Sequence, residues 1–164
     1  LRTGRSSFQG KYHGVDDCVL HPRPVRVGGP PIMLGSWRPR MLSIAGPHID
    51  TWNIWWSDFG NTPEGLARFK EQVDETLVGA GRAVGEVETT AAVLVQMPGG
   101  VGRTMGDYPG GPIEPLRGTS LEIAEQIMAF ARVGASHVQL VVDPITTASL
   151  EHLAPMLEAL RSSS

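Results

Sequence analysis

The chain has 164 residues and a mass of 17.6 kDa, which is enough for one ordinary domain with its own core. Hydrophobic residues make up 41% and charged residues 19%, a composition that is typical of globular proteins and excludes a disordered or fibrous chain. The net charge of −3, without a basic stripe, argues against a nucleic-acid partner. No apolar run reaches the roughly 18 residues of a membrane span, and no signal peptide is visible, so we expect no membrane partner and a cytoplasmic location.

Residues 1–29 are rich in glycine and proline, and we expect them to form an irregular insertion or lead-in. Residues 30–164 are expected to form a single domain. Its first β/α unit combines a short apolar strand near 31–35 with a helix near 39–46. Gly46-Pro47 then stops that helix.

The second unit has a strand over about 49–55. Thr62-Pro63-Glu64 is a strong helix start, because it combines a capping hydroxyl, a proline in the first helical position and an acid in the first turn. The helix that follows carries an apolar stripe at three- and four-residue spacing. The stripe consists of Leu66, Phe69, Val73 and Leu77.

The third strand is predicted over 88–96, with apolar residues on both faces as in a buried parallel strand. A long loop over 97–118 leads to a capping box at Thr119-Ser120-Leu121-Glu122. A fourth strand over 137–142 precedes a last helix. Leucines at 150, 153, 157 and 160 mark its core face, and Pro155 predicts a kink or an early break there.

Four β/α units in succession require parallel strands with crossover helices. Eight such units close into a barrel of about 250 residues. The sequence therefore predicts an α/β fold with about the length of half a (β/α)8 TIM barrel, four parallel β/α units behind an irregular N-terminal lead-in. We expect the chain to be a piece of a longer protein or to complete the barrel with a second copy.

The most informative stretch is 30–53, PPIMLGSWRPRMLSIAGPHIDTWN. An apolar strand ends in Gly35-Ser36, a basic turn with Arg38 and Arg40 follows, and a helix opens. Backbone amides at a strand's carboxyl end and at a helix start suit an anion such as phosphate. We therefore predict an anion pocket at Gly35 and Ser36.

These residues and their neighbours resemble the C-terminal half of the luciferase-like monooxygenases, the flavin- or deazaflavin-dependent oxidoreductases of the bacterial luciferase type. The resemblance implies that the fold is the C-terminal half of a (β/α)8 TIM barrel. The resemblance rests on the order and spacing of several short motifs rather than on any one of them. They are FQGKY at 8–12, PRPV at 22–25, PPIMLG at 30–35, DTWN at 50–53, TPEG at 62–65 and GASHV at 134–138.

The resemblance implies a full barrel that binds FMN or the deazaflavin coenzyme F-420 and acts on a small organic substrate. In the family the loop after the fifth strand contacts the cofactor phosphate. Carried over to this sequence, that loop is Leu34, Gly35 and Ser36, with Trp37 and Arg38 beside it. Trp52 and Asn53 match the family's Asp-x-Trp pattern and are expected to line the pocket near the ring.

The first four β/α units of the family pattern are absent, so no catalytic residue can be assigned. We expect this chain to be inactive alone and to need a second copy, as a homodimer, or the missing N-terminal half-barrel. Whether oxygen or a hydride is the reaction partner stays open. Family members usually carry glycine where Ser36 stands, a change that adds a hydroxyl to the site.

Two other hypotheses remain. A non-catalytic half-barrel could serve as a binding or assembly module through its unpaired strand edges. An unrelated doubly wound nucleotide-binding domain would need a glycine fingerprint that this sequence lacks. The five histidines never adopt close metal-ligand spacing, Cys18 is alone, and we expect no metal site. The loop over 99–106 lacks the Gly-Lys-Ser/Thr ending of a phosphate loop, and we interpret it as a flap over the barrel mouth.

Overall fold

The computed structural model describes residues 3–103 and 113–162, and the chain divides into two compact units, Leu1–Ile32 and Met33–Ser164. The first unit differs from the irregular lead-in that we predicted, because it contains an antiparallel hairpin of β1 (Arg5–Gln9) and β2 (Gly14–Val19). Phe8 pairs with Val15 across the two strands, and the Gly10 amide donates to the His13 carbonyl at 2.9 Å to close the turn. The turn thus begins at Gly10, and the residues before and after the turn pair as strands.

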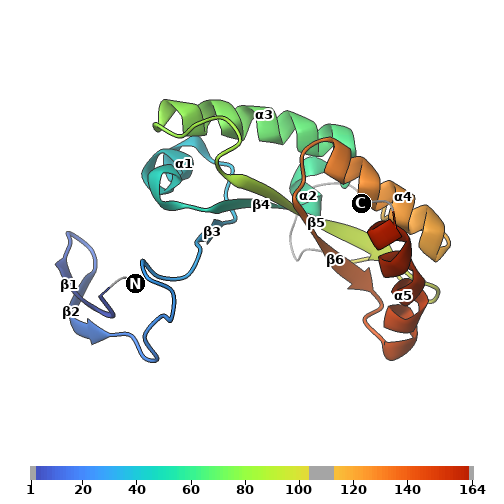
Figure 1. Cartoon of the computed structure of the whole chain (residues 1–164), viewed down its shortest axis with the longest axis horizontal. Helices are drawn as coiled ribbons and strands as arrows, with labels where there is room; N and C mark the ends of the chain where they lie inside the picture. Colours follow the sequence, from blue (N-terminus) through green and yellow to red (C-terminus); the bar gives the residue numbers. More distant parts are fainter. Residues whose placement is uncertain (1–2, 104–112, 163–164) are drawn as a thin grey trace. The chain divides into compact units, whose positions relative to one another are not determined.

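The second unit is built on a four-stranded parallel sheet in the order β3-β4-β5-β6, which confirms the predicted β/α units. The strands are β3 (Met33–Leu34), β4 (Thr51–Trp55), β5 (Glu88–Gln96) and β6 (His137–Asp143). The helices are α1 (Pro39–Ala45) with the 3-10 turn η1 (Gly46–His48), α2 (Trp56–Phe59), α3 (Pro63–Gly79), α4 (Ser120–Arg132) and α5 (Thr147–Ser162). Figure 1 shows their arrangement.

Both predicted helix starts are confirmed. The Thr62 hydroxyl accepts the Gly65 amide at 3.1 Å at the start of α3. Gly65 has to be glycine, because a Cβ there would lie 1.8 Å from the Phe59 carbonyl oxygen. At the start of α4, Thr119 and Glu122 form the complete capping box.

The last helix departs from the prediction of an early break. α5 continues through Pro155 to Ser162. Proline removes one hydrogen bond, to the carbonyl of Glu151, and that residue is exposed, so water can replace the lost donor. The buried side of α5 is formed by Ser149, Leu153 and Met156. Leu150 and Leu157, which we expected on the core face, are about half exposed.

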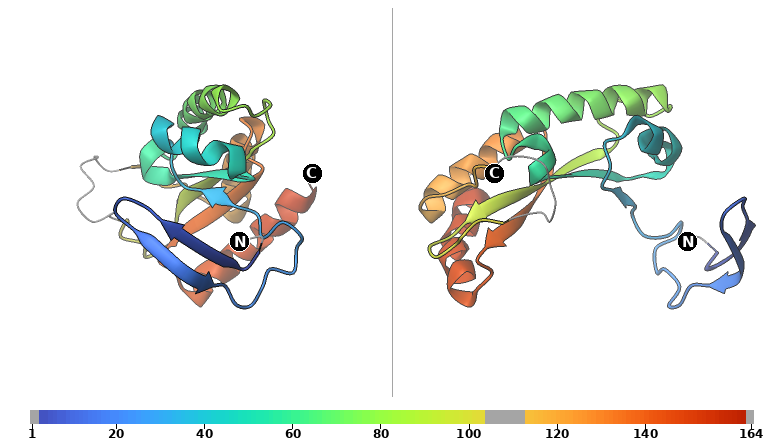
Figure 2. Two further views of the ribbon diagram at one scale, coloured as in Figure 1. Left: turned by 90° about the vertical axis from the view of Figure 1, so that its left-hand side faces the viewer. Right: turned by 180° about the vertical axis from the view of Figure 1, so that it is seen from behind.

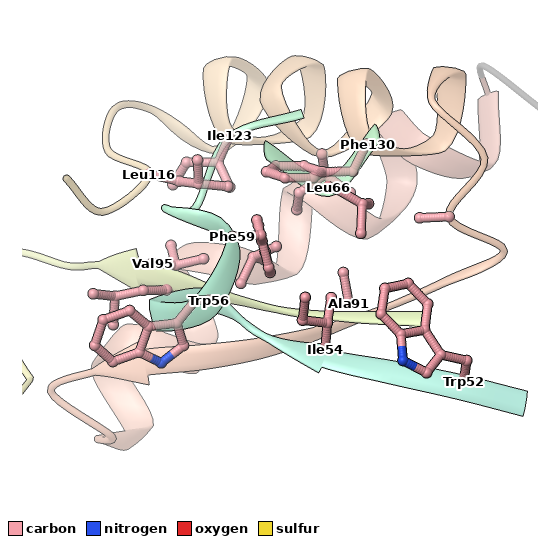
Figure 3. Packing of buried hydrophobic residues seen from close by; sticks show 14 of the residues in the cluster. Trp52, Ile54, Trp56, Phe59, Leu66, Ala91, Val95, Leu116, Ile123 and Phe130 are labelled. Carbon is pink, nitrogen blue, oxygen red and sulfur yellow. The ribbon is translucent and has the colours of Figure 1, made fainter. Parts of the chain in front are cut away.

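The core lies between one face of the sheet and the helices. In the register of the sheet, Trp52 and Ile54 of β4 share a face with Ala91, Val93 and Val95 of β5, because side chains alternate along a strand. Figures 1 and 2 show α3 and α4 along this face, and Figure 3 shows their side chains meeting those of the strands. The buried helix residues include Leu66, Val73, Leu77, Ile123, Ile127 and Phe130.

The second face of the sheet is buried along the central strand β5, at Thr90, Ala92 and Leu94, but only partly covered on the strands beside it. Met33 is exposed, while Asn53, Trp55, Gln139 and Val141 are half-buried. They belong to this face because each is one residue away from a side chain that points toward the helices. Among the described residues, the sheet thus has one face packed against helices and a second face that is incompletely covered on either side of β5.

Asn61 takes the place of a strand where β4 ends. β4 stops level with Ala92, but β5 continues to Gln96. The Asn61 Oδ1 accepts the Leu94 amide at 2.9 Å, and its Nδ2 donates to the carbonyls of Leu94 and Glu114, each at 3.0 Å. Beyond it, Leu116 continues the pairing with β5: its amide donates to Leu94 and its carbonyl accepts from Gln96. Asn61 is 3% exposed and has a positive φ of 56°, which asparagine tolerates well.

Replacing Asn61 should therefore destabilise the fold. Asn61→Leu leaves the Leu94 amide and the Glu114 carbonyl without their partner, and each buried polar group left unpaired costs about 1–3 kcal/mol. We expect a loss of about 3 kcal/mol in the free energy of unfolding, measured with urea. Asn61→Gly is the control for backbone strain, since it suits the positive φ but also lacks the amide, and it should still lose about 2 kcal/mol. Wild-type stability of Asn61→Gly would contradict the role of the side chain.

The capping box of α4 should make stability depend on pH. The Glu122 carboxylate accepts the Thr119 amide at 2.7 Å and the Thr119 hydroxyl at 2.9 Å, and these two hydrogen bonds lower its pKa below the ordinary value. A lowered pKa means that the contribution is present at neutral pH and is lost as pH falls through the folded-state pKa, below about 4.3. Glu122→Gln should be less stable than wild type at pH 7, and the difference should shrink as the pH falls below about 4.3. Glu125→Gln, an exposed change on the same helix, should show no such trend.

Candidate functional site

The turn between β3 and α1 contains the residues that we predicted to hold a cofactor phosphate. Leu34 is half-buried and packs against the core. Gly35 is exposed, and a Cβ built there would meet no atom within 4 Å, so open space lies beside the backbone. The Ser36 hydroxyl oxygen accepts the Arg38 amide at 3.3 Å, which leaves the hydroxyl proton available to another acceptor.

Trp37 orients the guanidinium of Arg38. The Arg38 Cζ lies 4.0 Å from the centre of the Trp37 ring, a cation–π contact. The Trp37 ring is itself fixed by an edge contact with Phe69 of α3, with centroids 5.3 Å apart and an interplanar angle of 68°. Arg38 is exposed but stacked, so its charge is held beside the turn.

Trp52 and Asn53 lie on opposite faces of the sheet. The Trp52 ring is 1% exposed within the core, and its Nε1 donates to the Ser36 carbonyl at 3.1 Å. Asn53 lies on the second face, where its Oδ1 accepts the Thr90 hydroxyl at 2.8 Å. Trp52 thus contacts the turn from the core, through its hydrogen bond to the Ser36 carbonyl. Asn53 lies on the second face of the sheet instead.

A cavity of about 390 Å³ lies at the carboxyl ends of β5 and β6. In parallel sheets these ends are where ligands bind. Its apolar and polar lining residues come from the two strands and from both ends of the loop that follows β5. They are Leu94, Gln96, Val101, Gly102, Arg103, Ile113, Glu114, Pro115, Arg117 and Asp143.

Asp143 fixes one wall of the cavity. Its buried carboxylate accepts the Gly102 amide at 2.7 Å, and its carbonyl accepts the Met97 amide at 2.8 Å. Arg103 donates to the Val142 carbonyl at 3.0 Å. A Cβ at Gly100 would lie 2.5 Å from the Asp143 carbonyl oxygen, so this close approach requires glycine. Of the predicted flap, residues 99–103 are attached to β6 in this way, and 104–106 lie outside the described residues.

The turn and the cavity occupy different places. Leu34 at the end of β3 is level with Trp52 and Thr89, while the cavity begins at the end of β5. From Thr89 to Leu94, the first residue of β5 that lines the cavity, the strand advances five residues, about 17 Å at about 3.3 Å per residue. The turn could be located from the sequence, whereas the cavity was not predicted. Its signal was the polar Gln96 and Asp143 that end the two most apolar strands.

The described part of the chain has neither a cluster of metal ligands nor a membrane-spanning helix. No group of three or more histidine, cysteine, aspartate or glutamate side chains there is placed to hold a metal ion. Among residues 3–103 and 113–162, no helix is both long enough and apolar enough to cross a membrane.

Two buried tryptophans allow the hydrogen bond to the turn to be tested. Trp56 is 3% exposed, and its Nε1 has no hydrogen-bond partner among the described residues, whereas that of Trp52 donates to Ser36. Both rings lie in the core (Figure 3). Trp52→Phe and Trp56→Phe remove similar volume, so Trp52→Phe should cost about 1 kcal/mol more in the free energy of unfolding. Equal losses in urea denaturation would mean that the hydrogen bond contributes nothing.

Solved structures resemble this chain in fold. An F-420-dependent secondary alcohol dehydrogenase in complex with an F-420–acetone adduct matches with a TM-score of 0.65 and 16% identity, covering 96% of this chain and 56% of that one. The coenzyme F-420 dependent tetrahydromethanopterin reductase from Methanopyrus kandleri matches with a TM-score of 0.66 and 15% identity, covering 95% and 57%. Riboflavin lyase with modified FMN and riboflavin matches with a TM-score of 0.65 and 15% identity, covering 97% and 48%.

The chain spans about half the length of these structures, which confirms the predicted half of a TIM barrel. At this level of identity the likeness shows the fold alone. No protein of curated function matches the sequence. A family model described as luciferase-like monooxygenase matches residues 1–98, more than half of the chain. The chain therefore belongs to the luciferase-like monooxygenase family.

Proposed function

We propose that this chain is the C-terminal part of a flavin- or deazaflavin-dependent oxidoreductase that acts on a small organic substrate, and that its β3–α1 turn holds the cofactor phosphate. The observation that carries the proposal is the turn itself. The family resemblance selects Gly35 and Ser36, and there the structure has open space beside the backbone and hydrogen-bond donors around it.

The residues of the turn fit a phosphate group. The Ser36 hydroxyl can donate, and the Arg38 guanidinium adds a positive charge that stacking on Trp37 keeps in place. A charge-assisted hydrogen bond of this kind contributes about 1.5–3 kcal/mol. Trp52 acts through Ser36 and is a positioning residue in this proposal, and Leu34 anchors the end of β3 in the core.

When bound, the isoalloxazine or deazaflavin ring supplies the redox chemistry, and the protein supplies binding and orientation. Asn53 lies on the second face of the sheet, which is the inner face of a closed barrel, and in this proposal it lines the ring pocket. The three similar structures include two F-420-dependent enzymes and one with modified FMN, which supports testing both cofactors.

Completion of the barrel is part of the proposal. The sheet ends in β3 on one side and β6 on the other, and a homodimer or a separate N-terminal half would supply the missing strands. The chain alone is proposed to be inactive, and its proposed location is the cytoplasm.

The proposal is tested by titrating the 164-residue chain with FMN and with F-420, following fluorescence and recording the mass in solution. Ser36→Asp places a negative charge against the phosphate and should raise the Kd of the bound cofactor by at least about tenfold. Ser43→Asp is the matched control: it adds the same charge at an exposed position on α1 and should leave the Kd unchanged.

Equal Kd values for Ser36→Asp and wild type would refute the placement of the phosphate. A colourless chain that binds neither cofactor but self-associates would instead favour the second candidate, a non-catalytic assembly module. The observation behind that candidate is the pair of sheet edges at β3 and β6, which face no further strand in the described chain.

A further inference from the structure

We propose that the cavity at the ends of β5 and β6 binds a small organic monoanion with an apolar body, and that Glu114 competes with this ligand for Arg117. That this ligand is a substrate rests on the proposed function. The binding itself does not, since it needs no cofactor. The proposal assigns a substrate class to a cavity that lies away from the phosphate turn.

Arg117 is held in place on one side only. Its Nε donates to the Gln96 Oε1 at 2.6 Å, and its carbonyl accepts the Gln126 side chain at 2.9 Å. The other edge of the guanidinium, at Nη1, meets the Glu114 Oε2 at 3.4 Å. A guanidinium anchored through Nε presents its two Nη groups as a fork that matches a carboxylate.

The contact with Glu114 is weak enough to be replaced. The side chains of Arg117 and Glu114 are 57% and 85% exposed, and ion pairs between exposed groups contribute little. A ligand carboxylate that also buries its apolar part in the cavity has the advantage over Glu114, whose side chain gains no such burial.

The lining of the cavity defines the rest of the ligand. Leu94 is buried at its base, and Ile113 and Pro115 add apolar surface, which suits a ring or a short hydrocarbon chain. Gln96 accepts from Arg117 through its oxygen, so its amide nitrogen is the group that can donate to a ligand.

The acidic residues limit the charge of the ligand. Asp143, which is in register with Gln96, also lines the cavity and already accepts the Gly102 amide, while Arg103 donates to the Val142 carbonyl. The Asp143 and Glu114 carboxylates balance the charges of Arg103 and Arg117, so a ligand with a second negative charge would meet a lining without excess positive charge. The cavity therefore favours a single carboxylate over a dianion or a phosphate.

The probe for this inference is benzoate, with benzamide as its neutral counterpart and inorganic phosphate as a small anion without an apolar body. Binding to the 164-residue chain is measured by NMR, following the amides of Leu94, Gln96 and Arg117. Benzoate should bind at least about fivefold tighter than benzamide, because only benzoate pairs with the guanidinium.

Substitutions of Glu114 and Arg117 should change the affinity for benzoate in opposite directions. Glu114→Gln removes the competitor and should tighten benzoate binding about threefold or more, while Arg117→Gln should weaken it about tenfold. Arg117→Lys keeps the charge without the fork and should weaken it less, which separates loss of binding from loss of folding. Arg68→Gln, an exposed change on α3, is the matched control and should have no effect.

Equal binding of benzoate and benzamide, or a Glu114→Gln variant that binds benzoate no better, would overturn the inference. Phosphate binding as tight as that of benzoate would also overturn it, because it would make the cavity a general anion site. None of these measurements contains FMN or F-420, so failure of the proposed cofactor role and failure of this inference are distinguished.

Discussion

A buried strand has to pair its backbone on both sides, and in this protein β5 does so over nine residues although β4 offers only five. The side chain of Asn61 and the segment around Leu116 make up the difference. Because Leu116 is bound there, Arg117 comes to lie beside Gln96 at the end of the strand. The walls of the cavity thus follow from a requirement of the backbone rather than from contacts among the lining side chains.

Features that depend on neighbouring residues could be predicted from the sequence. The central strand over 88–96 and the capped helix starts at Thr62 and Thr119 are local patterns, and the structure has them at those positions. The hairpin of β1 and β2 was missed, since its short strands are exposed on every residue and carry no clear alternation. The exposed leucines of α5 had the spacing of a core face, but burial is decided by which elements pack against that face.

Part of the candidate site could likewise be predicted from the sequence, and part could not. The turn at Gly35 and Ser36 could be located because a strand, a turn and a helix follow one another in the chain. The direction of the Trp52 ring could not be predicted, because neighbouring strand residues point to opposite faces and only the register shows which face meets the helices. The contact between Gln96 and Arg117 joins residues 21 apart, across a loop with no periodic pattern.

The unequal lengths of the edge strands β3 and β6 also constrain how two copies of the chain could form a symmetric barrel. Two copies that close one barrel around a two-fold axis along its length would pair each β6 with the other copy's β3, because only that arrangement keeps all strands parallel. β6 offers seven residues for pairing and β3 offers two. A symmetric closure would leave most of each β6 edge without a ladder, whereas a different chain segment with a longer first strand could pair along its full length.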